Sequence, residues 1–139
     1  VSYMVGEGEK KLVGAGSIKP GSYVIFDGVA CVVKSVQTSK TGKHGHSKAR
    51  IEAVGIVDNR KIIKVMPTHD NAEVPIIEKE TGQVLSVHDD IANVMDLKSY
   101  ETFDIKIDDE LKDQVKEGSQ VVYWIILGQK IVKQVRQSG

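Results

Sequence analysis

The stretch SYVIFDGVACVVKSV, residues 22–36, decides how this chain begins to fold. Two apolar runs flank Asp27-Gly28, and a two-residue type I′ turn needs positive φ angles at both of its central residues. Asp and Gly tolerate those angles better than most residues. The stretch therefore predicts a β-hairpin with strands over residues 22–26 and 29–36.

Further short strands follow this hairpin. Residues 49–57 alternate, with Ile51 and Ala53 on one face and Arg50 and Glu52 on the other, and residues 61–66 form another short apolar segment. Several short antiparallel strands in so small a region favour a small barrel, because a closed sheet leaves no unpaired edge.

The second half predicts strands and one helix. We expect strands over residues 74–78, 84–87, 91–97, 102–107, 120–127 and 129–135. Residues 108–116 predict the helix, because Asp108 can cap it, Leu111 and Val115 form an apolar stripe, and Gly118 follows its end. From residue 84 on, the order β-β-β-α-β-β is typical of an OB-type barrel.

A domain boundary is predicted near Thr68, where the apolar pattern stops and the charge changes sign. Residues 1–68 contain 11 basic and 5 acidic residues, a net charge of +6, whereas residues 69–139 contain 8 and 14, a net charge of −6. The basic half is the better candidate for contact with a polyanion.

The composition excludes several protein classes. With 27% charged residues and no apolar run near the roughly 20 residues of a membrane helix, we expect a protein without a membrane span. Cys31 is the only cysteine, so no internal disulfide can form, and a cytoplasmic location is expected. Cys31 lies in an apolar strand and is expected to be buried.

The segment 37–48, QTSKTGKHGHSK, has neither an acidic residue nor a large apolar one. A connection of this length inside a small barrel implies either function or disorder. Lys40, Lys43, Lys48 and Arg50 add positive charge, and Gly42 and Gly45 flank Lys43-His44. The residues alone are compatible with a solvated flexible tip and with a phosphate-binding loop.

Particular residues of this segment argue against a catalytic site and against a metal site. A P-loop would need Gly where Gln37 stands and Ser or Thr where His44 stands. His44 and His46 lack a third local ligand for a metal ion. No general acid and base, and no nucleophile with its base, stand at a spacing typical of an active site, so we predict no enzyme, no metal site and no cofactor. We expect Tyr123 and Trp124 to be core residues.

The sequence of residues 39–46, SKTGKHGH, followed by Lys48, closely resembles the hypusine loop of the translation factor 5A family. Residues 19–23, 74–77 and 95–97 also resemble family landmarks. The resemblance implies an all-β chain of two small barrels: an SH3-like domain over residues 1–68 that carries the loop 37–48, and an OB-fold domain with one helix over residues 69–139.

In that family the lysine at the position of Lys43 receives a 4-aminobutyl group from spermidine through deoxyhypusine synthase, which uses NAD. The chain would be the substrate, with hypusine or deoxyhypusine at Lys43. The implied role is to bind the ribosome near the E site and to promote peptide bond formation at stalled sequences such as consecutive prolines, as the bacterial analogue, elongation factor P, does.

The resemblance also implies partners and contacts. The partners would be the ribosome and the P-site tRNA, and we expect a monomer. The residues expected to contact RNA are Lys40, Gly42, His44, Gly45, His46, Lys48 and Arg50. The alternative function is an unmodified RNA-binding clamp that uses the same basic loop.

Overall fold

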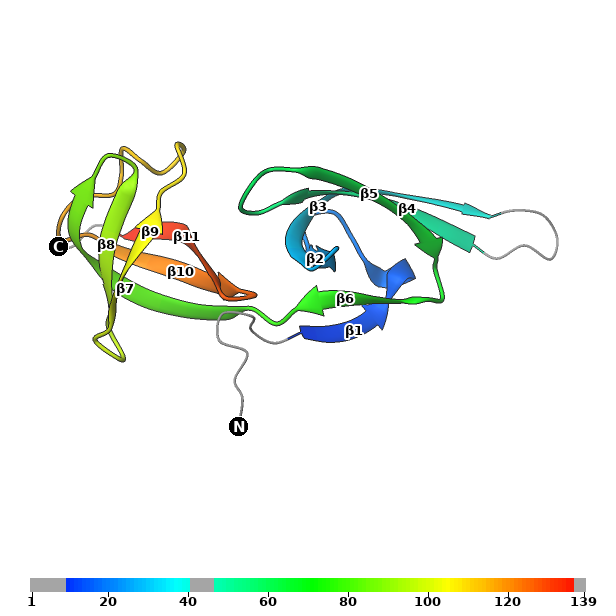
Figure 1. Ribbon diagram of the computed structural model, residues 1–139, viewed down its shortest axis with the longest axis horizontal. Helices are drawn as coiled ribbons and strands as arrows, with labels where there is room; N and C mark the ends of the chain where they lie inside the picture. Colours follow the sequence, from blue (N-terminus) through cyan, green and yellow to red (C-terminus); the bar gives the residue numbers. More distant parts are fainter. Residues whose placement is uncertain (1–9, 41–46, 137–139) are drawn as a thin grey trace. The chain divides into compact units, whose positions relative to one another are not determined.

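The computed structural model describes residues 10–40 and 47–136, which form two compact units divided between Ile76 and Ile77. Eleven strands and one short 3-10 helix account for the regular structure in these ranges (Figure 1). The predicted all-β class with two β units is confirmed. Within the ranges described, no helix has the length and hydropathy needed to cross a membrane.

The N-terminal unit has six strands in two sheets. They are β1 (Lys10–Gly14), β2 (Tyr23–Phe26), β3 (Val29–Lys40), β4 (Ser47–Gly55), β5 (Lys61–Pro67) and β6 (Asn71–Pro75), with a 3-10 turn, η1, at Ala15–Ser17. The larger sheet has the order β2-β3-β4-β5, and β1 pairs with β6. The predicted hairpin is present, and Asp27 and Gly28 have φ angles of 54° and 77°. A core that includes Val24, Cys31 and Ile51 lies between the sheets.

The domain boundary lies eight residues beyond the predicted one. β6 pairs antiparallel with β1, with Val13 opposite Ala72, and Ala72 is part of the N-terminal core. The polar residues around Thr68 are thus a turn within the first unit, not a linker. The sequence did not predict β1, because its lysine-rich strand is mostly exposed. It also joined residues 74–78 into one strand, although β6 ends at Pro75 and β7 begins at Glu78.

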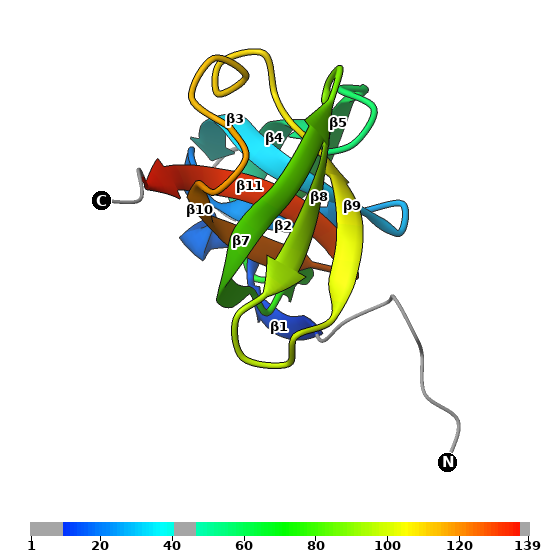
Figure 2. The same cartoon turned by 90° about the vertical axis from the view of Figure 1, so that its left-hand side faces the viewer.

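The C-terminal unit is a five-stranded sheet. Its strands are β7 (Glu78–His88), β8 (Ile91–Asp96), β9 (Thr102–Lys106), β10 (Gln120–Ile126) and β11 (Gln129–Arg136), in the order β11-β10-β7-β8-β9. Figure 2 looks onto this unit, where β7, β8 and β9 follow one another across the sheet. The outer strands β9 and β11 also come into contact, which closes the sheet around its own core. Ile105 and Ile107 are buried in this core.

The predicted helix over residues 108–116 is replaced by a series of turns. Most of its backbone hydrogen bonds join residues three apart, as from Leu111 N to Asp108 O at 2.9 Å, and one joins residues four apart, from Val115 N to Leu111 O at 3.2 Å. The first turn of a helix costs conformational entropy, and a helix this short adds too few further hydrogen bonds to offset that cost. Because turns already place Val115 in the core and Leu111 against it, packing does not require the helix.

Candidate nucleic-acid interface

The predicted basic loop is in large part a paired hairpin. β3 continues to Lys40 and β4 begins at Ser47, with Lys40 opposite Ser47 and Gln37 opposite Arg50. Half of the twelve residues expected to form a loop are therefore strand. Sequence patterning missed this extension because the outer ends of both strands lack the apolar alternation that marks a buried face.

Lys48 and Arg50 lie on the exposed side of this hairpin, which we call the hairpin face. Ala49 and Ile51, which alternate with them along β4, are fully buried, so the two cationic side chains must point away from the core. Arg50 stands opposite Val65 of β5, which is 61% exposed. The structure thus brings two of the predicted RNA-contacting residues together on one open surface.

Lys40 does not share that surface. Lys40 pairs with Ser47, two residues along from the pair of Thr38 with the buried Ala49. Its side chain therefore lies on the same side of the hairpin as Ala49, opposite to Lys48 and Arg50. Five other predicted site residues lie outside the described residues: Gly42, Lys43, His44, Gly45 and His46. The described hairpin ends are the attachment points of this segment.

The charges of the hairpin face remain available to a ligand. Glu52, the next residue on the same side of β4, pairs with Lys61 Nζ at 3.4 Å, and Lys64 Nζ pairs with Asp27 Oδ1 at 2.9 Å. Among the described side chains, no carboxylate lies within ion-pair distance of Lys48 or Arg50. These two cations can therefore neutralise phosphates without first breaking an internal ion pair.

Thr68 supports the hairpin at Ser47, the first residue of β4, a role that sequence reasoning missed. Its backbone N–H and its Oγ1 both donate to Ser47 O, at 3.0 and 3.3 Å. Gly16 of η1 lies against it, since a Cβ added at Gly16 would stand 3.2 Å from Thr68 Cβ. No local pattern could reveal this contact, because it joins three segments that are distant in sequence.

The cysteine and the two histidines among the described residues lie singly in the fold. Cys31 is fully buried, and burial raises the pKa of its thiol, which agrees with the predicted structural role. His69 and His88 are exposed and each lies beside an aspartate, Asp70 and Asp89. In the two ranges that the structure covers, no three His, Cys, Asp or Glu side chains gather as they would around a metal ion.

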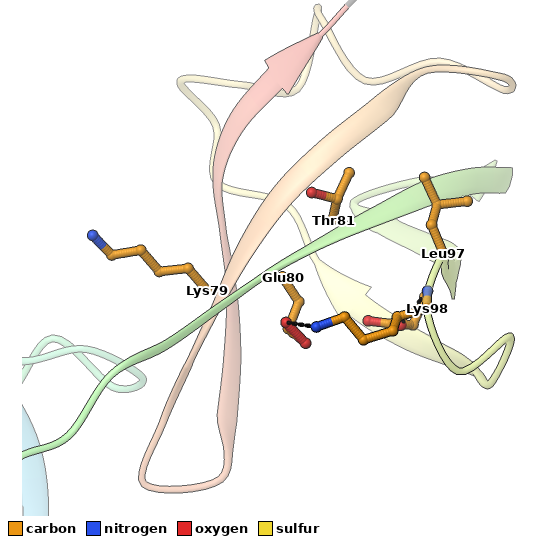
Figure 3. A pocket seen from close by; sticks show the side chains of 6 residues that line it. Lys79, Glu80, Thr81, Leu97 and Lys98 are labelled. Atoms are coloured by element: carbon orange, nitrogen blue, oxygen red, sulfur yellow. Dashed lines mark hydrogen bonds and ion pairs between the residues drawn. The ribbon is translucent and has the colours of Figure 1, made fainter.

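A surface pocket of about 450 Å³ opens on the C-terminal unit (Figure 3). It is lined by Lys79, Glu80, Thr81, Asp96, Leu97 and Lys98. Lys98 Nζ reaches Glu80 Oε1 at 3.7 Å across the pocket, whereas Lys79 extends to the other side of β7. The charged groups inside the pocket thus already face one another.

Asp96 at this pocket is a structural anchor. Its Oδ1 accepts hydrogen bonds from Lys98 N at 2.8 Å, Ser99 N at 2.9 Å and Ser99 Oγ at 3.3 Å, and its Oδ2 accepts one from the Tyr123 hydroxyl. The Tyr123 bond, followed by the Ser99 N–H, holds the pKa of Asp96 below its ordinary value. Burial, followed by the bond to Asp96, raises the pKa of Tyr123. With both oxygens occupied, Asp96 has little capacity left for a ligand.

The two neighbouring aromatic residues of β10 lie on opposite sides of the sheet. Tyr123 is buried in the core, as predicted, and its ring lies 5.0 Å from that of Phe103. The prediction that Trp124 is also a core residue is wrong. Alternation along β10 turns Trp124 to the outer side of the sheet, where Lys79 Nζ and Lys133 Nζ lie 4.7 and 4.8 Å from its ring centroid.

Comparisons with known proteins give one consistent result. Residues 10–70 match the family model "Translation initiation factor 5A-like, N-terminal". Residues 76–136 match "Eukaryotic elongation factor 5A hypusine, DNA-binding OB fold". The two matches meet near the boundary between the two structural units.

Whole-chain relatives agree with the family models. Translation initiation factor 5A of Thermococcus gammatolerans is 45% identical over 93% of this chain and 98% of its own length. That of Methanosarcina acetivorans is 47% identical over 86% and 93%. The solved structure of eukaryotic translation initiation factor 5A from Methanococcus jannaschii superposes with a TM-score of 0.85, with 39% identity over 97% of this chain and 98% of that one. Each of these names is that of a translation factor, and the chain belongs to the translation initiation factor 5A family.

Proposed function

We propose that this protein binds the ribosome near the E site and promotes peptide bond formation at stalled sequences, such as consecutive prolines, through a hypusine or deoxyhypusine at Lys43. The hairpin face carries this proposal: Lys48 and Arg50 point outward from a paired hairpin, free of carboxylate partners among the described residues, directly beside the segment that contains Lys43. Family membership supports the modification.

Lys43 acts as a recipient of chemistry in this proposal. Its Nζ gains a 4-aminobutyl group from spermidine and loses a proton. The C–N bond between this group and the rest of spermidine breaks, and 1,3-diaminopropane leaves with the proton; deoxyhypusine synthase and its NAD catalyse the transfer. The protein needs no cofactor of its own. A lysine must be neutral to form this bond, and nearby cations such as Lys40 and Lys48 disfavour its charged form when the synthase holds them close.

The lengthened side chain works by position. Its two amines reach into phosphate-lined RNA and hold the acceptor end of the P-site tRNA close to the attacking amine, which lowers the entropic barrier without adding an acid or a base. Lys48 and Arg50 fix the register of the hairpin on the RNA backbone, together with Lys40, His44 and His46 of the same segment. The β-ladder beneath them makes this placement rigid.

Two measurements test the proposal. In protein isolated from its own host, the peptide that spans Lys43 should be heavier by an aminobutyl or hydroxy-aminobutyl group. In reconstituted translation of a polyproline message, Lys43→Arg should lose the rescue activity, because it keeps the charge but cannot accept the group. Lys11→Arg, at an exposed site on β1, is the matched control and should keep full activity.

The opposite outcomes select the alternative function. A wholly unmodified Lys43 peptide from the host, or full rescue by Lys43→Arg, would favour an unmodified RNA-binding clamp in which Lys48 and Arg50 supply the contacts.

A further inference from the structure

The outer side of β7, β10 and β11 is a second cationic surface, and it contains the only tryptophan of the chain. Antiparallel pairing puts opposed residues on the same side of a sheet. Two neighbouring rows across the three strands are Lys79, Trp124 and Ile131, and Thr81, Val122 and Gln134. We call this surface, with Lys133 at the bulge of β11, the tryptophan face.

Charge is distributed unevenly over the C-terminal unit. Residues 77–139 contain 12 acidic and 8 basic residues, yet the paired rows of the tryptophan face contain no acidic residue. The next row along β10 and β11 adds another cation, Arg136, opposite Gln120. An acid-free cationic surface on an acidic unit marks the side that a polyanion can approach.

The outer side of β8 and β9 has the opposite character. On β9, Asp104 lies on the outer side and accepts a hydrogen bond from Asn93 Nδ2 at 2.9 Å. Asp89 and Asp90 form the turn before β8, and the turns over residues 108–117 carry five acidic residues against two lysines. This acidic surface includes strands 2 and 3 of the unit, where OB barrels often bind oligonucleotides. A nucleic acid would be repelled there.

We propose that the tryptophan face binds single-stranded RNA, with a base stacked on Trp124 and the adjoining phosphates on Lys79 and Lys133. The pairing of β10 with β11 shifts between Val122 and Tyr123, which leaves Lys133 in a β-bulge of β11, where it joins Lys79 at the indole ring. An aromatic ring flanked by basic side chains is the combination that sequence-tolerant single-strand binding uses.

The lysines that cover Trp124 in the free protein are exchangeable. An exposed cation–π contact is weak, whereas stacking of a base on an aromatic ring is stronger. When a base takes the place of one ammonium group on the indole ring, the flexible lysine side chain lets that ammonium group move to the phosphate of the same nucleotide. The Tyr123 hydrogen bond to Asp96 holds the strand from the opposite side, so the indole remains in place during this exchange.

Trp124 makes the proposal directly measurable, because it is the only tryptophan. The full-length Lys48→Gln/Arg50→Gln variant, which removes the charges of the hairpin face, is titrated with a 12-residue oligouridylate while tryptophan fluorescence is followed. We expect saturable quenching. Adding Lys79→Gln and Lys133→Gln should weaken binding about 25-fold at 0.1 M salt and lower the salt slope by about 1.4. Trp124→Leu should weaken binding of a labelled oligouridylate by roughly fivefold or more.

The matched control is Lys106→Gln/Lys112→Gln, which removes the same charge from β9 and the acidic turns and should change the affinity less than twofold. Equal losses in the control and in the Lys79/Lys133 variant, or no quenching at all, would overturn the proposal. A poly-glutamate peptide of equal charge that quenches Trp124 as well as the oligouridylate does would also overturn it, because the surface would then bind acidic chains in general. The result is independent of Lys43, so it stands or falls separately from the proposed function.

Discussion

The hairpin face and the tryptophan face are both cationic, but they lie in units of opposite charge. Residues 8–76 contain 11 basic and 6 acidic residues, whereas residues 77–139 contain 8 and 12. Lys48 and Arg50 follow the charge of their unit, and Lys79 and Lys133 oppose it. The net charge of a unit therefore indicates the hairpin face, but it gives no indication of the tryptophan face.

The two faces also differ in how strand geometry builds them. On the hairpin face, simple alternation along one strand separates Lys48 and Arg50 from the buried Ala49 and Ile51. On the tryptophan face, Lys79 and Lys133 come from strands far apart in sequence and meet at Trp124 only through register and a bulge. The first surface is a local property of the chain, and the second is a property of the sheet.

The largest expected effect comes from removing both faces together. At 0.1 M salt, neutralising Lys48 and Arg50 should weaken ribosome binding about 25-fold, and adding Lys79→Gln and Lys133→Gln should multiply the losses to several hundred-fold. Co-sedimentation with ribosomes measures both variants. If the variant with all four substitutions binds as well as the Lys48/Arg50 variant, the tryptophan face does not contact the ribosome.

Removal of the Tyr123 hydroxyl tests the support behind the tryptophan face. Tyr123→Phe should cost about 2 kcal/mol in the free energy of unfolding at neutral pH, because the hydrogen bond to the Asp96 carboxylate is charge-assisted. Thermal and denaturant unfolding measure this change. Tyr100→Phe is the matched control, since Tyr100 is 70% exposed, and it should be nearly neutral.

The same pair gives stability a pH dependence with a definite sign. The pKa of Asp96 is lowered on folding, so its contribution is present above the unfolded value of about 3.9 and is lost as the pH falls through the folded value. The pKa of Tyr123 is raised, so its contribution is present below about 10 and is lost as the pH rises toward the folded value. In Tyr123→Phe the alkaline loss of stability should disappear and the acid loss should shrink. An unchanged pH profile would contradict this coupling.

A smaller effect is expected where Thr68 supports the hairpin at Ser47. Thr68→Val keeps the shape of the side chain but removes the hydroxyl that donates to Ser47 O, which should cost about 1 kcal/mol in the free energy of unfolding. Thr68→Ser keeps the hydroxyl and should lose less. If the serine variant is the less stable of the two, packing of the threonine methyl against Gly16 matters more than the hydrogen bond.

The smallest effect is expected for Lys64→Gln. Lys64 and Asp27 form a surface ion pair with side chains 41% and 54% exposed, so its loss should change the free energy of unfolding by at most about 0.5 kcal/mol. Ribosome binding should change less than twofold, because Asp27 already neutralises this lysine. A loss as large as that of the Lys48/Arg50 variant would show that total charge, and not the hairpin face, governs binding.

Prediction from sequence succeeded where the signal was local. The Asp27-Gly28 turn, the burial of Cys31 and the outward side chain of Arg50 all follow from φ preferences or from the two-residue period of a strand. The predicted helix over residues 108–116 failed although its caps and stripe were favourable, because core contacts of Leu111 and Val115 form without it. The boundary at Thr68 failed because a turn inside a domain and a linker have the same polar composition.

The amino-acid sequence by itself determined the all-β class, the turns and the acid-free cationic segment around Lys43, since each depends on residues that are neighbours along the chain. Only the tertiary structure decided that β1 pairs with β6, that Thr68 braces Ser47, and that Lys79 and Lys133 meet at Trp124. These contacts depend on strand register over long sequence separations, and register is set by the packing of the whole sheet.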